Sequence, residues 1–402
     1  MTDVVESSEV SVLLDELTRA AGREDPYSRY SRLREIAPVV RADDGTLVVT
    51  GYAGCVAVTR DPRFGNPPSQ AMEFIAPGWE DHPATRLLFT SMLMTNPPDH
   101  TRLRRLVSSS FTARRVQALQ PRIAEMVEDR LDHVDGEIDF VEAFALPFPV
   151  DVISELVGVP EADRARFRGL VRDWGRILEA VTPEALQKAD PAAAAIRDYL
   201  ADLAQERREE PGEDLISALV AVEEGEQLTE DELVTMVALL FAAGFATTTN
   251  LLANSLVCLL RDPDQLARLR ADPALAPSAV EELLRYDSPV QLVRRMALED
   301  TEISGARIRA GERVVAHLGA GNRDPQRFAD PDRLDLTRAD NAPLSFGGGI
   351  HYCLGAPLAR LEAQTAIPAL VTRFPNLQLT GAPARRDSLV IRGYTALPIS
   401  VG

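Results

Sequence analysis

The sequence predicts a mainly α-helical protein with small β-sheets, of the α+β class. Long stretches with a helical spacing of apolar residues are separated by Pro and Gly breaks. One of them, Leu233–Leu260, has no charged residue, which is typical of a helix buried all round in a large protein. Short β-branched runs on either side of Asp43-Asp44-Gly45 indicate a β-hairpin. Helices therefore supply most of the predicted core.

The composition is that of an ordinary soluble protein. The 402 residues are 45% hydrophobic and 26% charged, and the net charge of -18 argues against nucleic acid as a general partner. The cysteines are too few and too far apart for a disulfide framework, which fits a reducing cytosol. The basic residues are almost all arginine, with Lys188 the one lysine, which indicates a high-GC bacterial genome such as that of an actinomycete.

The N-terminal part is predicted to form two helices, a hairpin and a third helix. Residues 1–10 are acidic, have no apolar core of a signal peptide, and are expected to be flexible in a cytoplasmic protein. The predicted elements are helices at Val12–Ala21 and Pro26–Ala37, strands at 39–42 and 46–50, and a helix at Tyr52–Arg60.

Residues 64–98 contain many prolines and are predicted to form a long loop. A loop of this length inside a compact domain is usually functional or disordered. Its apolar side chains favour a lid over a cavity, and a loosely packed surface loop is the alternative. They are Met72, Phe74, Ile75, Leu87, Leu88, Phe89, Met92, Leu93 and Met94.

Asp99–Arg105 opens the next predicted helix. His100 and Arg104 are four residues apart and share one face, where two cationic donors suit a pair of carboxylates. Further arginines form either a solvated basic face or a docking patch for an acidic partner. They are Arg102, Arg105, Arg114 and Arg115.

Amphipathic helices are predicted over 115–135, 151–158, 161–180 and 190–210. One of them has an apolar stripe for which core packing is the default interpretation. The stripe consists of Phe167, Leu170, Trp174, Ile177 and Leu178.

A capping box, Thr229-Glu230-Asp231-Glu232, predicts the start of the charge-free helix. By length Leu233–Leu260 could span a membrane, but its Thr, Asn and Ser residues and its acidic, amphipathic flanks argue against this. Within it, Gly244 and Thr247 share one face. The Thr247 hydroxyl can bond the Ala243 carbonyl or a ligand and so open the helix locally.

The stretch Phe346–Arg360 contains the strongest chemical signal. Gly347 to Gly349 disfavour regular structure and allow close backbone approach, and Cys353 lies just before a predicted helix at Ala356–Val371. A helix N-terminus stabilises a thiolate over a thiol. His351 adds a hydrogen-bond donor. A phosphate loop and a zinc site are the alternatives, but no Lys context or second ligand pair follows.

This stretch resembles the haem-binding loop of the cytochrome P450 family, Phe-x-x-Gly-x-His-x-Cys-x-Gly. Phe346, Gly349, His351, Cys353 and Gly355 occupy every fixed position. The resemblance implies that these residues bind haem b (iron protoporphyrin IX) and that the Cys353 thiolate is its axial iron ligand.

Further motifs occur in the order of this family. The resemblance implies that His100, Arg104 and Arg295 hold the haem propionates. It also implies that Ala243-Gly244-Phe245-Ala246-Thr247 is the oxygen-activating segment, although Ala246 stands where the family has an acid. Glu282, Arg285 and Arg333 match a buried charge network that supports the cysteine loop, with Arg333 following an Asp-Pro-x-x-Phe stretch at 324–328.

Several apolar side chains are implied to border the substrate. They are Met92, Leu93, Met94, Trp174, Phe241, Val290, Leu292, Val293 and Ile391. The C-terminal part, Leu377–Val401, is predicted to form strands.

The resemblance implies one cytochrome P450 domain over residues 1–402, present as a soluble monomer. The implied function is monooxygenation of a hydrophobic small molecule of natural-product biosynthesis, by hydroxylation or epoxidation with O2. Electrons would come from NAD(P)H through a ferredoxin reductase and a ferredoxin. The missing acid at Ala246 keeps open a peroxide-using or otherwise atypical enzyme, and a non-catalytic haem-binding protein is the other alternative.

Overall fold

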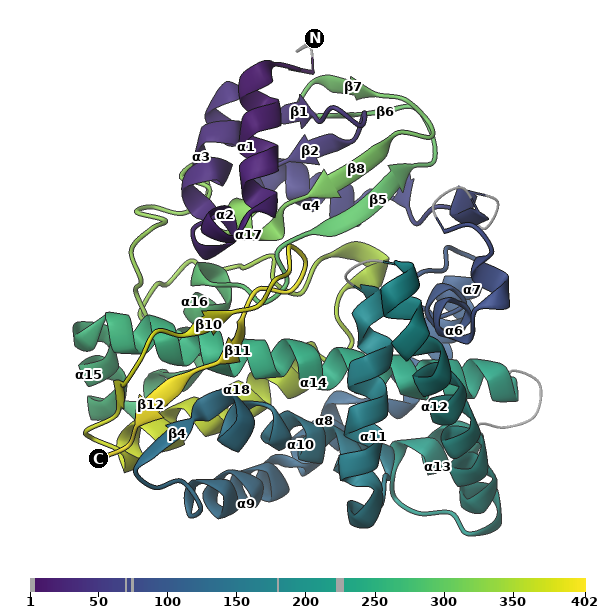
Figure 1. Cartoon of the computed structure of the whole chain (residues 1–402), viewed down its shortest axis with the longest axis vertical. Coiled ribbons are helices and arrows are strands. Elements are labelled where there is room, and N and C mark those ends of the chain that lie inside the picture. The colour runs from purple at the N-terminus through teal and green to yellow at the C-terminus, as the bar shows by residue number, and fades with distance from the viewer. Residues whose placement is uncertain (1–3, 69–70, 74–75, 179–180, 222–227) are drawn as a thin grey trace. The chain divides into compact units, whose positions relative to one another are not determined.

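The computed structural model describes residues 4–68, 71–73, 76–178, 181–221 and 228–402 (Figure 1). The chain divides into two compact units. Unit 1 contains Met1–Gly65, Val127–Ala145 and Thr247–Gly402, and unit 2 contains Asn66–Met126 and Leu146–Ala246. The chain therefore enters and leaves each unit more than once, and the single domain predicted from the sequence stays a prediction.

Unit 1 contains helices at both ends of the sequence. They are α1 (Ser8–Thr18), α2 (Ala20–Glu24), α3 (Tyr27–Ile36), α4 (Tyr52–Arg60), α15 (Pro263–Ala271), α16 (Ala276–Tyr286), α17 (Leu318–Gly321) and α18 (Ala356–Arg373), with the short turns η2 (Val141–Ala145), η4 (Pro273–Leu275) and η5 (Gly349–His351).

The regular elements described in unit 2 are all helices or helical turns. Its helices are α6 (Pro83–Phe89), α7 (Asp99–Ser110), α8 (Ala113–Ala118), α10 (Pro147–Val157), α11 (Glu161–Trp174), α12 (Pro183–Glu209) and α13 (Leu215–Val220), with the turns η1 (Trp79–Asp81) and η3 (Gly175–Leu178). Helices α9 (Gln120–Leu131) and α14 (Glu230–Arg261) have residues in both units.

The strands found among the described residues lie in unit 1, and the main sheet has the order β1-β2-β8-β5-β3. Its strands are β1 (Val39–Arg41), β2 (Leu47–Val49), β8 (Arg313–Ala316), β5 (Val293–Ala297) and β3 (Phe64–Gly65). The pair β2–β8 is parallel, and the others are antiparallel. The predicted hairpin is confirmed, with Val39 opposite Val49 and Arg41 opposite Leu47.

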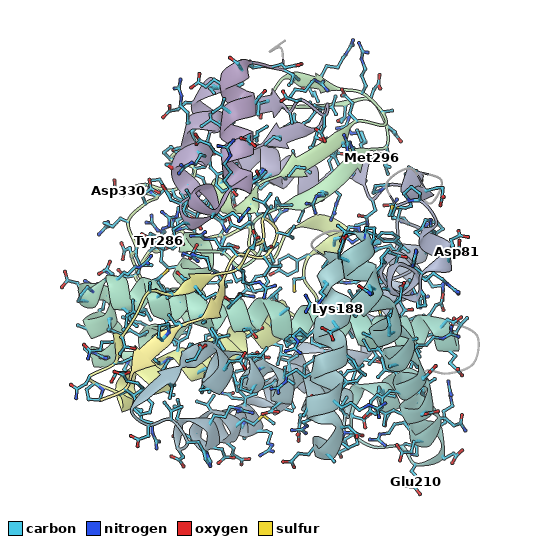
Figure 2. The ribbon with its side chains drawn as sticks, viewed as in Figure 1. Asp81, Lys188, Glu210, Tyr286, Met296 and Asp330 are labelled. Atoms are coloured by element: carbon cyan, nitrogen blue, oxygen red, sulfur yellow. The ribbon has the colours of Figure 1, made fainter. Side chains whose placement is uncertain are left out.

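The remaining strands form small antiparallel sheets. They are β4 (Glu137–Asp139), β12 (Pro398–Ser400) and β9 (Gln378–Leu379), then β6 (Thr301–Ile303) with β7 (Ala306–Ile308), and β10 (Ala384–Arg385) with β11 (Tyr394–Ala396). Figure 2 shows Met296 on β5 and Tyr286 at the end of α16 in this unit. Apolar side chains such as Leu47, Val49 and Val314 form the core beneath the main sheet, because alternate strand residues point to the same face.

The prediction of a loop throughout residues 64–98 is wrong. Helix α6 begins with Pro83 at its first turn, where the missing N–H costs nothing. It is preceded by the short turn η1. The lid residues Phe74 and Ile75 lie outside the described residues. Proline in this stretch thus starts a helix as well as interrupting the chain.

Helix α14 begins with the predicted capping box. The Glu232 backbone N–H donates to the Thr229 hydroxyl at 3.2 Å, and the Thr229 N–H donates to the Glu232 carboxylate at 2.9 Å. Among the described residues α14 is the one helix that is long and apolar enough to cross a membrane. The bent pair Val141–Val157 and Glu161–Leu178 reaches that length only if it is counted as one span. Inside the protein, 72% of its most apolar window is buried.

Candidate active site

The cysteine loop packs its backbone against helix α4. A Cβ atom added to Gly349 would lie 2.4 Å from the Thr59 carbonyl oxygen, and one added to Gly348 would lie 2.8 Å from the Thr59 hydroxyl. Gly349 also has a φ of +62°, which L side chains rarely adopt. The close backbone approach predicted for these glycines is therefore seen at Gly348 and Gly349, where the neighbouring element is α4.

Gly347 is different, because a Cβ added there would meet nothing within 4 Å. Its φ of +69° turns the chain after Phe346. The Cys353 N–H donates to the Phe346 carbonyl at 3.0 Å and closes the loop. This side of the loop is thus not covered by other atoms of the chain.

Cys353 is the cysteine with the environment of a reactive thiol. It is partly exposed and precedes α18, whose N-terminus begins at Ala356. The other cysteines are buried, and burial raises the pKa of the Cys258 thiol to about 12 and also raises the pKa of the Cys55 thiol. Within the described ranges no three His, Cys, Asp or Glu side chains could hold a metal ion, so a zinc site at Cys353 has no further ligands.

The middle of α14 has one open face in an otherwise buried helix. Ala243 is exposed, and Gly244, Ala246 and Thr247 are partly exposed, whereas the residues around them are buried. These four residues share a face because they are spaced three and four apart. The oxygen-activating segment implied by the sequence is thus the part of α14 that has surface to offer a ligand.

Two details of this segment differ from the sequence expectation. A Cβ atom added to Gly244 would lie 3.3 Å from the side chain of Ile153 on α10, so this glycine makes room for Ile153. The helix is continuous from Glu230 to Arg261, so the expected local opening at Thr247 is not seen. A hydrogen-bonded helix keeps its backbone closed unless a side chain or water enters it.

Glu362 on α18 is a functional candidate that the sequence did not reveal. Its side chain is 2% exposed, and burial raises its pKa well above the ordinary 4.5, while a hydrogen bond from Thr248 opposes this rise. Its Oε2 atom has no hydrogen-bond partner within the described structure. Burial therefore favours the protonated form of Glu362, which lies beside Thr248, the residue after Thr247. In sequence it resembles an ordinary surface carboxylate of an amphipathic helix.

Arg295 on β5 is a partly buried cation without a described carboxylate partner. Burial lowers the pKa of its guanidinium to about 10. Its one described hydrogen bond runs from Nη1 to the Arg294 carbonyl at 2.8 Å, and no described acidic group pairs with it. Desolvation of an uncompensated charge is costly, so the site favours an anionic ligand.

The two α7 residues implied to hold carboxylates lie in unit 2. His100 is buried at 2% exposure and Arg104 is partly exposed, one helical turn further along α7. They share the face predicted from their spacing.

The basic group on α7 and α8 is smaller than predicted. Arg102 forms an ion pair with Glu232 at the start of α14, and Arg115 donates to the Ser110 carbonyl at 3.1 Å. Arg105 and Arg114 are exposed. Tertiary packing thus places Glu232 beside Arg102 within unit 2. Arg102 is therefore no longer counted in the predicted basic patch.

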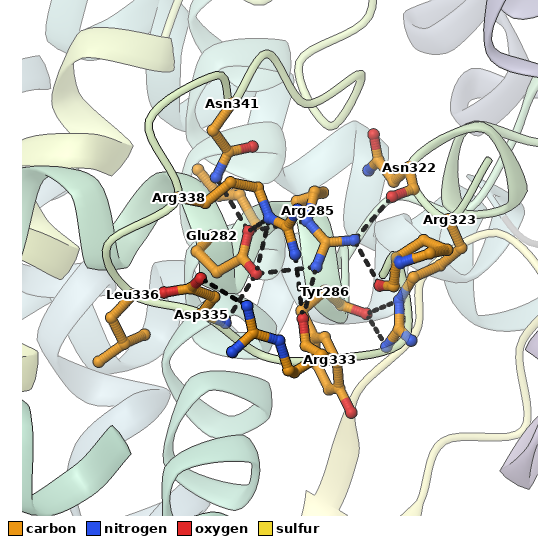
Figure 3. Close-up of polar contacts among 12 residues, drawn as sticks. Glu282, Arg285, Tyr286, Asn322, Arg323, Arg333, Asp335, Leu336, Arg338 and Asn341 are labelled. Carbon is orange, nitrogen blue, oxygen red and sulfur yellow. Dashed lines mark hydrogen bonds and ion pairs between the residues drawn. The ribbon is translucent and has the colours of Figure 1, made fainter. Parts of the chain in front are cut away.

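Glu282 and Arg285 of α16 form the buried pair that the sequence predicted (Figure 3). Both side chains are 0% exposed, and two N–H groups of Arg285 lie 2.7 Å and 2.8 Å from the two carboxylate oxygens. The Nη1 atom of Arg285 donates to the carbonyls of Asn322 and Pro331 at 3.0 Å and 2.7 Å. The pair therefore anchors the segment before the cysteine loop to α16.

The prediction of Arg333 as the third member is wrong. Its side chain is 63% exposed and pairs with Asp335 at 3.1 Å, so only its carbonyl accepts from Arg285 and Arg338 (Figure 3). The third member is Arg338, whose Nε lies 3.1 Å from Glu282 Oε2. Asn341 also donates to this carboxylate at 3.0 Å.

Some residues implied to border the substrate do lie together in unit 1. Val290 and Ile391 pair across an antiparallel bridge, and both are partly exposed. Val293 nearby in sequence is also partly exposed, whereas Leu292 is buried at 6%. The available surface at this place is aliphatic.

The implied contacts from unit 2 are less accessible. Leu93 is 40% exposed and Met94 partly exposed, but Met92 is buried at 5%. Trp174 is 1% exposed and donates from Nε1 to the Ala84 carbonyl at 3.1 Å. Phe241 is 0% exposed, and its ring packs edge-on against that of Phe167, with 4.6 Å between the ring centres. The implied substrate contact is therefore wrong for Trp174 and Phe241, which pack in the core and have almost no solvent-exposed surface.

Comparison with known proteins identifies the class to which this fold and site belong. The family described as "Cytochrome P450" matches residues 170–387. The chain is 43% identical over 400 residues to "Cytochrome P450 107B1" of Saccharopolyspora erythraea, covering 94% of this chain and 96% of that protein. It is 44% identical over 389 residues to "Cytochrome P450 monooxygenase PikC" of Streptomyces venezuelae, covering 93% and 91%.

A solved structure of P450BioI in complex with an acyl carrier protein has a TM-score of 0.89 and 38% identity, and covers 95% of this chain and 99% of that one. The chain belongs to the cytochrome P450 family. It has the cytochrome P450 fold, and its chemistry is that of a haem- and O2-dependent monooxygenase.

The residues present fit a haem. A partly exposed cysteine at a helix N-terminus can supply a thiolate, and Gly347 leaves one side of its loop open. Arg295 is a partly buried cation without a described acidic partner, which suits a propionate. The observation at Arg295 lies outside the loop motif that first indicated haem.

Proposed function

We propose that this monooxygenase inserts one oxygen atom into a hydrophobic small molecule of natural-product biosynthesis, by hydroxylation or epoxidation. Two observations support this substrate class. The partly exposed side chains of Val290, Val293 and Ile391 are aliphatic and offer no charge to a polar ligand. Relatives include proteins named "6-deoxyerythronolide B hydroxylase" and "Nocardicin C N-oxygenase", both 40% identical to this chain.

Cys353 is the proposed iron ligand, and its environment is the observation that carries the proposal. The α18 N-terminus and the hydrogen bond between the Cys353 N–H and Phe346 hold it in one position. His100, Arg104 and Arg295 would hold the propionates, and Phe346, His351 and Gly355 would border the ring. The haem supplies the O2 activation when bound.

Proton supply is assigned to the open face of α14 and to Glu362. Ala246 has no titratable group, so Thr247 is the polar side chain on that face. One residue on, the Thr248 hydroxyl is hydrogen-bonded to the Glu362 carboxyl, which holds a proton because burial raises its pKa. Water ordered by Thr247 would carry protons to the site, and Glu362 is the buried acid that can replenish them.

Electrons are proposed to come from NAD(P)H through a ferredoxin reductase and a ferredoxin to a monomeric, cytoplasmic enzyme. The exposed Arg105 and Arg114 suit an acidic ferredoxin. A peroxide-using enzyme is the second candidate, and the observation that favours it is Ala246 in place of an acid.

Replacement of Cys353 by His tests the assignment. Cys353→His should retain some haem but lose the red-shifted Soret band of the reduced carbonyl complex, which depends on a thiolate ligand. The buried Cys258→Ser variant is the matched control and should keep the band. Survival of the band in Cys353→His would exclude Cys353 as the ligand.

A further inference from the structure

Arg360 contacts both flanks of the cysteine loop. Its guanidinium carbon lies 4.4 Å from the centre of the Phe346 ring, a cation–π distance. Its Nη1 donates to the Tyr352 hydroxyl at 3.2 Å. Phe346 and Tyr352 are the residues that begin the motif and immediately precede Cys353. One side chain thus holds two points of the loop.

The same guanidinium is anchored to a different helix. Its Nε and Nη2 atoms donate to the two oxygens of Glu281 on α16, the second bond at 3.1 Å. Glu281 precedes Glu282, and neighbouring residues on a helix point about 100° apart. Consecutive carboxylates of α16 therefore hold separate parts of the chain: Glu281 holds the cysteine loop through Arg360, and Glu282 holds the segment before it.

An ion pair alone would explain little here. The side chains of Arg360 and Glu281 are 29% and 23% exposed, and pairs in contact with solvent contribute little to stability. The arrangement differs from a simple ion pair because the planar face of the Arg360 guanidinium lies on the Phe346 ring, while its edges bind the Glu281 carboxylate and the Tyr352 phenol. Lysine has no planar group and cannot make these three contacts together.

The loop geometry passes this restraint on to the cysteine. The Cys353 N–H donates to the Phe346 carbonyl at 3.0 Å, and the Tyr352 N–H donates to the Gly349 carbonyl at 3.2 Å. Movement of the Phe346 or Tyr352 backbone therefore moves Cys353. Gly347 has an open side, so the other described restraints on this stretch are the Gly347 N–H bond to the Leu344 carbonyl at 2.8 Å and the contact of Gly348 with Thr59.

We propose that Arg360 is a positioning residue of the cysteine loop, which clamps Phe346 and Tyr352 to Glu281 and thereby keeps Cys353 bound to the haem iron as a thiolate. The inference rests on the proposed role of Cys353. It assigns to Arg360 a function in keeping the ligand in its thiolate form, beyond an ion pair between α16 and α18.

The test compares Arg360→Gln, Arg360→Lys and Tyr352→Phe with Arg373→Gln. Arg373 is a matched control, because it lies at the end of the same helix and pairs with Glu128 and Asp132. The holoenzyme is reduced, exposed to carbon monoxide, and followed in mild denaturant. In Arg360→Gln the red-shifted Soret band should decay about tenfold faster than in wild type, the factor that corresponds to about 1.4 kcal/mol.

Arg360→Lys should restore only part of the lifetime, Tyr352→Phe should shorten it less than Arg360→Gln, and Arg373→Gln should leave it unchanged. The reduction potential of Arg360→Gln should fall, because the unpaired Glu281 carboxylate favours the oxidised iron. The double variant Arg360→Gln with Glu281→Gln should reverse that fall. An ion pair that only joins α16 to α18 would leave the band lifetime unchanged.

Equal band lifetimes and potentials in Arg360→Gln and Arg373→Gln would overturn the proposal. If Arg360→Gln does not fold, Tyr352→Phe decides, because it removes one hydroxyl, and an unchanged band lifetime in that variant would overturn the proposal as well. Absence of the red-shifted band in the wild-type protein would instead refute the role of Cys353. The two failures are therefore distinguishable.

Discussion

The Nε atom of Arg338 lies 3.1 Å from Oε2 of Glu282, a carboxylate that is 0% exposed. Arg338 therefore completes the buried network around Glu282, together with Arg285 and Asn341. The network ties α16 to the segment between Asn322 and Asn341, which leads into the cysteine loop (Figure 3). Loss of any buried member leaves a charge without its partner.

Glu282→Ala should destabilise the protein by about 3–5 kcal/mol, because it leaves Arg285 buried without a carboxylate. Urea unfolding of the holoenzyme measures this. Arg338→Gln should also destabilise measurably, whereas Arg333→Gln should change stability by less than about 0.5 kcal/mol, since its side chain is 63% exposed. Equal losses for Arg333→Gln and Arg338→Gln would contradict the assignment.

Arg295→Met should weaken haem retention and raise the thermal stability of the apoprotein. The substitution removes an anion-binding group, so haem transfer to an excess of apomyoglobin should be about tenfold faster, which corresponds to about 1.4 kcal/mol. It also removes a partly buried charge that has no described carboxylate, so the apoprotein should unfold at a higher temperature. Unchanged haem transfer would remove Arg295 from the propionate site. Arg313→Gln, on the neighbouring strand and half-exposed, is the control.

Glu362 should make the protein less stable as the pH rises. Its pKa in the folded state is raised, so the folded protein binds one proton more tightly than the unfolded chain does. Stability is therefore lost progressively as the pH rises above about 4.5, the ordinary pKa of the group. Glu362→Gln should flatten the dependence of unfolding temperature on pH between roughly pH 5 and pH 8. Identical slopes for both proteins would show that Glu362 does not bury a proton.

Thr247→Ala should divert reducing equivalents into hydrogen peroxide while substrate binding persists, because Thr247 is the polar side chain on the open face of α14. Glu362→Gln should also uncouple turnover, but only where proton resupply limits the rate. The control is Thr249→Ala, since Thr249 is buried and points about 200° away from Thr247. Peroxide formed per NADPH consumed is the measurement. Unchanged coupling in Thr247→Ala would exclude a relay through this hydroxyl.

Turnover supported by a ferredoxin should fall as the salt concentration rises, because electrostatic steering is screened. Turnover supported by peroxide should not change. The double variant Arg105→Gln with Arg114→Gln should slow the ferredoxin-supported reaction and leave the peroxide-supported reaction unaffected. Arg166 is an exposed arginine of α11, and Arg166→Gln should change neither reaction. If both reactions respond equally to salt, the exposed arginines have no part in docking.

The features that the sequence determined are those set by local spacing. The capping box at Thr229 and Glu232, the hairpin around Asp43-Asp44-Gly45 and the Glu282–Arg285 pair each involve residues a few positions apart. Their geometry follows from the helical or strand repeat and hardly depends on the rest of the chain. The position of Cys353 before α18 belongs to the same group.

The tertiary structure decided the contacts between residues far apart in sequence. It places Arg338, and not Arg333, beside Glu282, and residues 83–89 form a helix. It also buries Trp174 and Phe241 in the core. It also brought Glu362 to Thr248 and Arg360 to Phe346. No periodicity encodes such pairs, because packing of whole elements determines which side chains meet. The sequence thus indicated the cysteine that we propose as the iron ligand, and only the fold showed that Arg360 contacts its loop and that Glu362 lies beside Thr248.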